Sequence, residues 1–167
     1  MAHAQTKLGP NTADLIGNLP TVGSTAPAFV LSANDMSDKH LKDFAGKNII
    51  LNIFPSIDTG VCATSTRKFN QYLATLQNTV VLCISKDLPF AQKRFCGTEG
   101  IDKAITLSDF RSRGFGKDYG VELTSSNFSG LFARAIVVID PSGKVKYTEL
   151  VPVIGEEPNY DAALKAL

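Results

Sequence analysis

Apolar residues run almost without interruption through two short stretches of the chain, residues 48–54 (NIILNIF) and residues 79–85 (TVVLCIS). Continuous apolar runs of this length are typical of strands buried on both faces, as in a parallel sheet. Between them, apolar residues recur with helical spacing, which predicts a helix over about residues 62–77. A helix between two buried strands indicates a right-handed crossover unit.

The pattern continues this unit toward the C-terminus. We expect a helix over residues 88–96, with Asp87 as its cap and Gly97 at its end. Residues 134–150 predict a hairpin that turns at 140–143. The other expected elements are a strand at 29–31, a helical turn at 41–46, a strand at 104–107, a helix at 110–119, and a last helix with Tyr160, Ala163, Leu164 and Leu167 on one face.

The order of the clear elements is β-α-β-α followed by β-β-α, which is the order of a thioredoxin-like fold. We therefore expect an α/β protein with a central mixed sheet flanked by helices, an N-terminal extension and an insertion before the final hairpin. The 167 residues fit a single domain over 1–167. Gly, Pro, Thr and Asn residues in the first part predict a hairpin or turn segment over residues 1–22.

The net charge, the lengths of the apolar stretches and the first residues of the chain limit the classes of partner and location that we expect. The net charge is +1, with 17 basic and 16 acidic residues and no basic block, which argues against a nucleic-acid partner. No apolar stretch approaches the ~20 residues of a membrane span, so no membrane association is expected. The chain starts without the pattern of a signal peptide, which favours a cytoplasmic location. In that reducing compartment, three cysteines indicate chemistry or core packing rather than a disulfide framework.

Cys62 stands where the first buried strand gives way to the next helix. Ligands bind at such strand ends, and the positive end of a helix makes a thiol easier to ionise. Thr59, as the N-cap, is expected to accept the Cys62 backbone N–H and to offer its hydroxyl proton to the sulfur or to a bound oxygen. Gly60 permits close backbone approach, and Pro55 is placed to shield the sulfur from water. The alternative is that Cys62 is a small apolar residue at a helix start.

Arg134 opens the first strand of the final hairpin, which brings it to the same sheet edge as Cys62 if the fold is as predicted. Its guanidinium would stabilise a thiolate and orient an oxygen substrate; a solvated strand-end arginine is the alternative. Arg111 is a weaker candidate for the same pocket. Cys96, at the predicted end of a helix, is either inert packing or a partner for Cys62, and Cys83 lies among strand hydrophobes as a core residue.

Other kinds of site find no support in the sequence. There is no C-x-x-C pair, no phosphate-binding or dinucleotide glycine motif and no set of zinc ligands, so we expect no metal and no cofactor. A protease-like pair of Cys62 with His40 is conceivable, but nothing in the sequence brings His40 to the site. His3 is equally remote along the chain.

The segment Pro55–Cys62 (PSIDTGVC) has the P-x-x-x-T-x-x-C pattern of peroxiredoxins. The wider runs 51–62, 79–85, 87–92 and 94–97 resemble the bacterial thiol peroxidase branch, the Tpx-type atypical two-cysteine peroxiredoxins. The resemblance extends from about Gly23 to the C-terminus.

This resemblance implies a thiol-dependent peroxidase. Cys62 would be the peroxidatic cysteine and Cys96 the resolving cysteine of the same chain. Thr59 and Arg134 would complete the catalytic site, with Pro55 as its lid. The resemblance also implies reduction of hydrogen peroxide and of alkyl or lipid hydroperoxides through a Cys62 sulfenic acid and a Cys62–Cys96 disulfide. Thioredoxin would reduce this disulfide again, and the protein would be a homodimer.

Gly60 and Val61 are further expected to bind substrate, with Arg111 as a weak addition. The resemblance implies in addition that Cys83 is not needed for turnover. The same thiol pair could instead serve a redox sensor or binding module with slow turnover, an alternative that the sequence leaves open. A copper-chaperone relative would need a C-x-x-x-C pair that is missing.

Overall fold

The computed structural model describes residues 2–167, so the first residue of the predicted 1–22 segment lies outside it. The strands are β1 (Gln5–Leu8), β2 (Asn11–Asp14), β3 (Val30–Ser32), β4 (Asp38–His40), β5 (Asn48–Ile53), β6 (Thr79–Ser85), β7 (Ile105–Ser108), β8 (Ala135–Ile139) and β9 (Val145–Leu150). The helices are the 3-10 turn η1 (Leu41–Phe44), α1 (Gly60–Tyr72), α2 (Pro89–Glu99), α3 (Phe115–Asp118) and α4 (Tyr160–Lys165).

Seven strands form one mixed sheet in the order β4-β3-β7-β6-β5-β8-β9. Strands β5, β6 and β7 run parallel to one another, whereas β8 and β9 add an antiparallel pair beside β5. The parallel strands are joined by α1 and α2, as crossover connections require. The predicted thioredoxin-like α/β fold is thereby confirmed.

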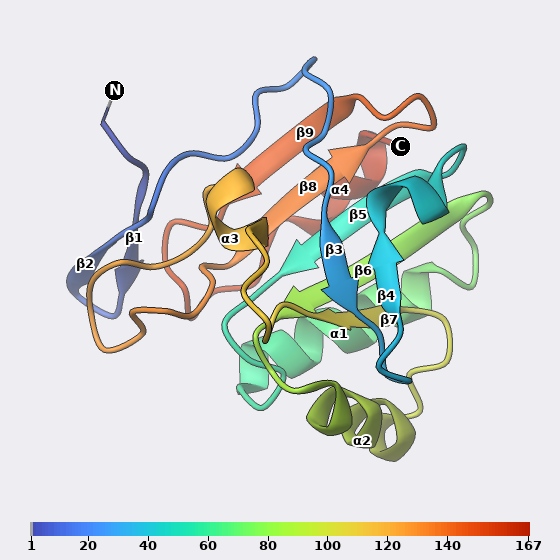
Figure 1. Ribbon diagram of the computed structural model, residues 1–167, viewed down its shortest axis with the longest axis horizontal. Helices are drawn as coiled ribbons and strands as arrows, with labels where there is room; N and C mark the ends of the chain where they lie inside the picture. The colour runs from blue at the N-terminus through green and yellow to red at the C-terminus, as the bar shows by residue number, and fades with distance from the viewer. Residues whose placement is uncertain (1) are drawn as a thin grey trace.

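Each face of the sheet carries its own apolar core, because alternate strand residues point to opposite sides. One core unites Ile50, Val81 and Ile136 with side chains of α1, α2 and α4. The other unites residues such as Leu51 and Leu82 with the aromatic side chains around α3 and the chain before β3. Figure 1 shows the long helices α1 and α2 on one side of the sheet and the short α3 on the other.

The N-terminal hairpin of β1 and β2 is a separate two-stranded sheet at one end of the molecule (Figure 1). It does not stand free, because Lys7 donates its backbone N–H to Pro152 and accepts that of Ile154, at 2.9 and 2.8 Å. Ala13 and Leu15 bury their side chains against Leu123, Ala133 and Ile154. The hairpin is therefore fixed to the segment that follows β9.

Two helix ends differ from the expectations. Helix α1 stops at Tyr72, and turns complete the path to Asn78, which adopts the left-handed φ of 49°. Helix α2 passes through Gly97 and ends at Gly100, whose φ of 66° ends the helix in a left-handed cap. Gly97 was the wrong glycine because it keeps helical dihedral angles, which any residue can adopt.

The start of α2 and the insertion also differ. Leu88, not Asp87, is the N-cap of α2, because the carboxylate of Asp87 is engaged elsewhere. Only residues 115–118 of the predicted helix at 110–119 are helical, and β4 was not predicted at all. None of the helices described in residues 2–167 is long and apolar enough to cross a membrane.

Candidate active site

Cys62 is the third residue of α1 and its side chain is fully buried. Strand β5 ends at Ile53, and the loop that follows delivers the chain to Thr59, whose extended backbone makes it the N-cap. The hydroxyl oxygen of Thr59 lies 2.6 Å from the Cys62 sulfur. This side chain makes no cap hydrogen bond to the helix backbone, so the prediction that it accepts the Cys62 N–H was wrong.

The Thr59 hydroxyl has two acceptors within reach but only one hydrogen to donate. The carbonyl oxygen of Ser56 lies at 3.1 Å and the sulfur of Cys62 at 2.6 Å. With a neutral thiol, Thr59 can donate to Ser56 and accept from the sulfur. With a thiolate, the hydroxyl proton turns to the sulfur. The Thr59 hydroxyl can therefore hydrogen-bond to the Cys62 sulfur either as acceptor or as donor.

Arg134 lies directly before β8, and β8 pairs with β5, so the predicted approach of its side chain to Cys62 is realised. Its Nη2 lies 3.3 Å from the sulfur, and its Nε donates to the carbonyl oxygen of Ile154 at 2.7 Å. Only 2% of the residue is exposed. Nη1 is buried and finds no hydrogen-bond partner among residues 2–167.

A small cavity of about 160 Å³ borders this group. Five of the residues singled out from the sequence line it, namely Pro55, Thr59, Gly60, Val61 and Arg134. The rest of its wall comes from Leu8 of β1, Phe128, Ile154 and Gly155. The wall is largely apolar, and it includes two residues that contact the Cys62 sulfur, Thr59 and Arg134.

Sequence reasoning missed the apolar wall because its residues come from loops and the N-terminal hairpin, whose packing leaves no periodic signal. Arg111 is not brought to the cavity; it is exposed, with its guanidinium over the ring of Phe110 at 5.0 Å. His40 lies on β4, the edge strand separated from β5 by β3, β7 and β6, and contacts Asp43. A pairing of His40 with Cys62 is therefore excluded by the fold.

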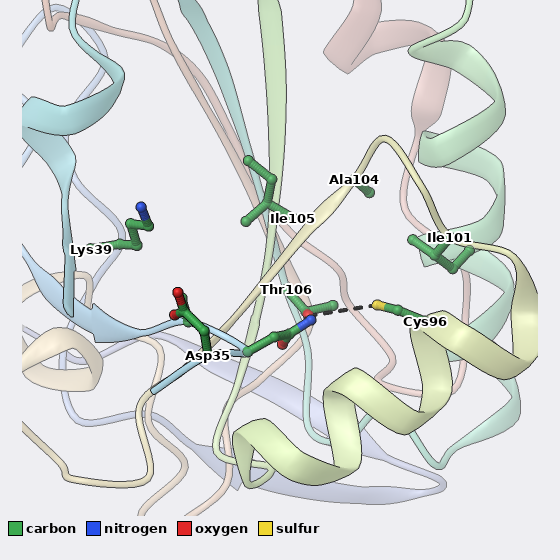
Figure 2. A pocket seen from close by; sticks show the side chains of 9 residues that line it. Asp35, Lys39, Cys96, Ile101, Ala104, Ile105 and Thr106 are labelled. Atoms are coloured by element: carbon green, nitrogen blue, oxygen red, sulfur yellow. Dashed lines mark hydrogen bonds between the residues drawn. The ribbon is translucent and has the colours of Figure 1, made fainter. Parts of the chain in front are cut away.

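Cys96 occupies a different environment, half-buried on α2. Its sulfur lies 3.6 Å from the hydroxyl oxygen of Thr106, which in turn donates to Asn34 at 2.9 Å. Figure 2 shows the thiol pointing toward Thr106 from one wall of a pocket, with Asp35 and Lys39 across from it. Burial raises the pKa of the Cys96 thiol, and the hydrogen bond with Thr106 only partly opposes this. Cys96 is thus held as a neutral thiol at neutral pH.

Cys83 is a core residue of β6 with no exposed surface. Burial raises the pKa of its thiol to about 12, and the amide of Asn52 is its neighbour at 3.6 Å. A thiol with so high a pKa is a poor nucleophile. The structure thus gives Cys83 the inert environment expected of a strand hydrophobe.

All three cysteines are free thiols, and Cys62 and Cys96 contact residues in different parts of the sheet. Cys96 contacts Thr106 of β7, whereas Cys62 contacts Arg134 beside β8, and two strands lie between β7 and β8. The two sulfurs therefore lie in separate hydrogen-bonding environments and are not joined to each other in this structure.

The profile of the Redoxin family matches residues 21–164 of the chain. Thiol peroxidases are similar over nearly the whole sequence: that of Mycobacterium tuberculosis is 54% identical, with 98% of each chain covered. That of Corynebacterium glutamicum is 52% identical, with 98% of this chain and 99% of the relative covered. The crystal structure of a peroxiredoxin-like protein from Aquifex aeolicus superimposes with a TM-score of 0.91 at 40% identity, covering 99% of this chain and 98% of that one.

A thioredoxin-like sheet with a buried thiol at a helix start, matched over most of its length by the Redoxin profile, defines a redoxin. The identity to curated relatives over almost the full length places the chain more narrowly, in the thiol peroxidase family of peroxiredoxins. It is accordingly an enzyme of the peroxidase class.

Proposed function

We propose that Cys62 is the peroxidatic cysteine and that it reduces hydroperoxides directly. The observation that carries this proposal is the position of its buried sulfur between Thr59 Oγ1 and Arg134 Nη2. The thiolate attacks one peroxide oxygen and the O–O bond breaks. Cys62 becomes a sulfenic acid, and the other oxygen leaves as water or an alcohol after taking up a proton. Arg134 and Thr59 stabilise the charge that develops on the two oxygens.

Cys96 is proposed as the resolving cysteine. Its sulfur attacks the sulfenic acid of Cys62, water leaves, and an intramolecular disulfide forms. A dithiol of the thioredoxin type then attacks this disulfide and restores both thiols, while its own sulfurs become a disulfide. The half-exposed position of Cys96, beside a pocket of about 300 Å³, supports its role over that of the buried Cys83.

The proposed substrates are hydrogen peroxide and alkyl or lipid hydroperoxides. The apolar cavity walls formed by Leu8, Phe128 and Ile154 support the second group, since they offer contacts to a hydrocarbon chain. A homodimer is also proposed. Leu88 and Phe90, exposed to 52% and 64% at the start of α2, support an apolar contact between copies there. The cytoplasmic location stays a prediction from the sequence.

A single experiment tests the roles of the three cysteines. The reduced protein is treated with one equivalent of peroxide, and disulfides are mapped by mass spectrometry in parallel with peroxide consumption driven by thioredoxin. We expect a Cys62–Cys96 bond, loss of consumption in Cys62→Ser, loss of recycling in Cys96→Ser and little change in Cys83→Ser. A Cys62–Cys83 bond would contradict the proposal. Full disulfide formation with negligible turnover would favour a redox sensor instead.

A further inference from the structure

Asp87, which sits between β6 and α2, uses its carboxylate to hold the loop that precedes Cys62. One carboxylate oxygen accepts the hydroxyl of Ser56 at 2.7 Å. The other accepts the backbone N–H of Ile57 at 2.7 Å and the hydroxyl of Ser85. Hydrogen bonds to an ionised carboxylate are stronger than those between neutral groups. The carboxylate therefore fastens the loop over residues 55–58 to the end of β6.

The fastened loop in turn orients the group that touches the reactive sulfur. The carbonyl oxygen of Ser56 accepts the backbone N–H of Thr59 at 3.1 Å, and it also lies 3.1 Å from the Thr59 hydroxyl, whose single hydrogen can go either to it or to the sulfur. That hydroxyl lies 2.6 Å from the Cys62 sulfur. A path of hydrogen bonds thus leads from Asp87 through Ser56 and Thr59 to Cys62. Asp87 itself touches neither the sulfur nor the cavity beside it.

The same corner of the molecule is tied to the helix that carries Cys96. Gln92 is fully buried, and its amide donates to the hydroxyl of Ser85 at 3.2 Å and to the carbonyl oxygen of Leu107 at 3.0 Å. Cys96 follows Gln92 by four residues, so the two side chains share one face of α2. The hydroxyl of Ser85 thus donates to Asp87, which holds the loop before Cys62, and accepts from Gln92 on the helix that carries Cys96.

We propose that Asp87 is a positioning residue that sets the balance between the two chemical steps. While its carboxylate holds Ser56 and Ile57, the loop keeps Thr59 on the sulfur and favours attack on the peroxide. When those hydrogen bonds open, the start of α1 is free to carry Cys62 toward Cys96. This inference rests on the proposed roles of Cys62 and Cys96, and it adds a residue that the pattern of the sequence had indicated as a helix cap.

Asp87→Asn tests the inference, with Asp58→Asn as the matched control. Asn keeps the size of the side chain but carries an NH2 group in place of one carboxylate oxygen. That group is a donor, so it cannot accept the hydrogen bonds that the replaced oxygen accepts in Asp87. Asp58 lies in the same loop and is exposed, and its side chain makes no hydrogen bond within residues 2–167. Both variants remove one negative charge near the site, which by itself would favour the thiolate and speed its oxidation.

Rapid-quench mass spectrometry measures the rate of Cys62 oxidation by hydrogen peroxide and the rate of the following disulfide bond in one sample. For Asp87→Asn we expect oxidation to slow about tenfold, because charge-assisted hydrogen bonds are lost. We expect disulfide formation to become faster and overoxidation at high peroxide to fall. Ser56→Ala, which removes one donor only, should shift both rates in the same directions by less.

Three outcomes would overturn this role. In the first, both rates of Asp87→Asn equal those of Asp58→Asn. In the second, Cys62 oxidation is faster in Asp87→Asn than in the wild type. In the third, Asp87→Asn loses both rates in parallel and has a lowered melting temperature. The failure of the proposed function looks different, since peroxide would then be consumed equally well by the Cys62→Ser protein. If peroxide consumption by the wild type depends on Cys62 but the two rates of Asp87→Asn are unchanged, only the role of Asp87 is contradicted.

Discussion

Arg134 holds a nitrogen of its guanidinium 3.3 Å from the sulfur of Cys62, across 72 positions of the sequence. The contact exists because β8 pairs antiparallel with β5, so the start of one strand meets the end of the other. A second nitrogen of the same group is anchored on the carbonyl oxygen of Ile154. The third, Nη1, keeps a free hydrogen-bonding direction among the described residues.

Replacement of Arg134 by lysine is expected to slow peroxide reduction by about 10²-fold, the usual cost of a lost donor to a developing negative charge. Lysine keeps the charge but cannot contact the sulfur, the Ile154 carbonyl and a peroxide oxygen at once. Stopped-flow measurement of the second-order rate constant checks this, with circular dichroism as the test of folding. A folded Arg134→Lys variant with the wild-type rate constant would contradict the role given to the Arg134 guanidinium.

Thr59 is expected to matter through its hydroxyl and not through its methyl group. Thr59→Val removes the only hydroxyl within residues 2–167 that contacts the sulfur and should lower the rate of Cys62 oxidation about tenfold. Thr59→Ser keeps the hydroxyl and should retain most of the activity. The same stopped-flow assay compares the two variants, and equal losses in both would show that shape rather than hydrogen bonding is required.

The rate of disulfide formation should rise with pH. Burial raises the pKa of Cys96, so at neutral pH this residue is a thiol and the attacking thiolate is scarce. Because the pKa of Cys96 is raised, its thiolate fraction is still growing when the pH reaches the ordinary pKa range of a cysteine thiol. The rate of disulfide formation should therefore keep increasing through that pH range and should not reach a plateau below it.

Thr106 gives this pH dependence a specific test. Its hydrogen bond lowers the pKa of Cys96, so Thr106→Val should raise that pKa further and slow disulfide formation at any fixed pH below it. Quenched reactions analysed by mass spectrometry between pH 6 and 9 follow the bond directly, over the range in which cysteine ordinarily titrates. A profile that does not move on substitution would argue that another group controls the step.

Phe128 is expected to favour bulky hydroperoxides over hydrogen peroxide. Its ring forms part of the apolar wall next to Pro55 and Ile154. In Phe128→Ala, the rate with cumene hydroperoxide should fall several-fold relative to that with hydrogen peroxide, since apolar contact area is lost for one substrate only. Val22→Ala, at an exposed apolar residue outside the cavity, is the control. An unchanged ratio of the two rates would remove Phe128 from substrate selection.

Gly120 is expected to be the least replaceable glycine for stability. It has a φ of +67°, and a Cβ atom there would overlap the carbonyl oxygen of Asn18, which belongs to the backbone and cannot turn away. Gly120→Ala should lower the free energy of unfolding by more than about 2 kcal/mol. Gly46→Ala, at φ +84° with open space around it, should cost only about 1 kcal/mol. Urea denaturation of both variants measures the difference.

The buried strands and the contacts of Cys62 with Thr59 and Arg134 are the parts that the sequence predicts well. Strand β6 spans residues 79–85 as expected, and the site unites Cys62, Thr59 and Arg134 as the strand order required. These features depend on local periodicity and on one topological rule. The identity of Cys96 as the partner thiol has no such local signal, and it stays a proposal.

Long-range polar contacts explain most of the differences. Asp87 follows a strand and precedes a helix, which is the pattern of a cap, but its carboxylate binds a loop some 30 residues earlier. The short edge strand β4 has only three residues, too few to leave a hydrophobic period. Gly97 and Gly100 are indistinguishable in sequence, and only the backbone dihedral angles reveal which of them ends α2.

The attachment of β1 has a practical consequence for work with this enzyme. Leu8 forms part of the wall of the cavity beside Arg134. The backbone of Lys7 is hydrogen-bonded to the segment that supplies Ile154, whose carbonyl oxygen anchors Arg134. Deletion of the first hairpin would therefore reshape this cavity and loosen the guanidinium. Purification tags, immobilisation linkers and fluorescent fusions joined ahead of residue 5 should be validated against an untagged enzyme before substrate preferences are compared.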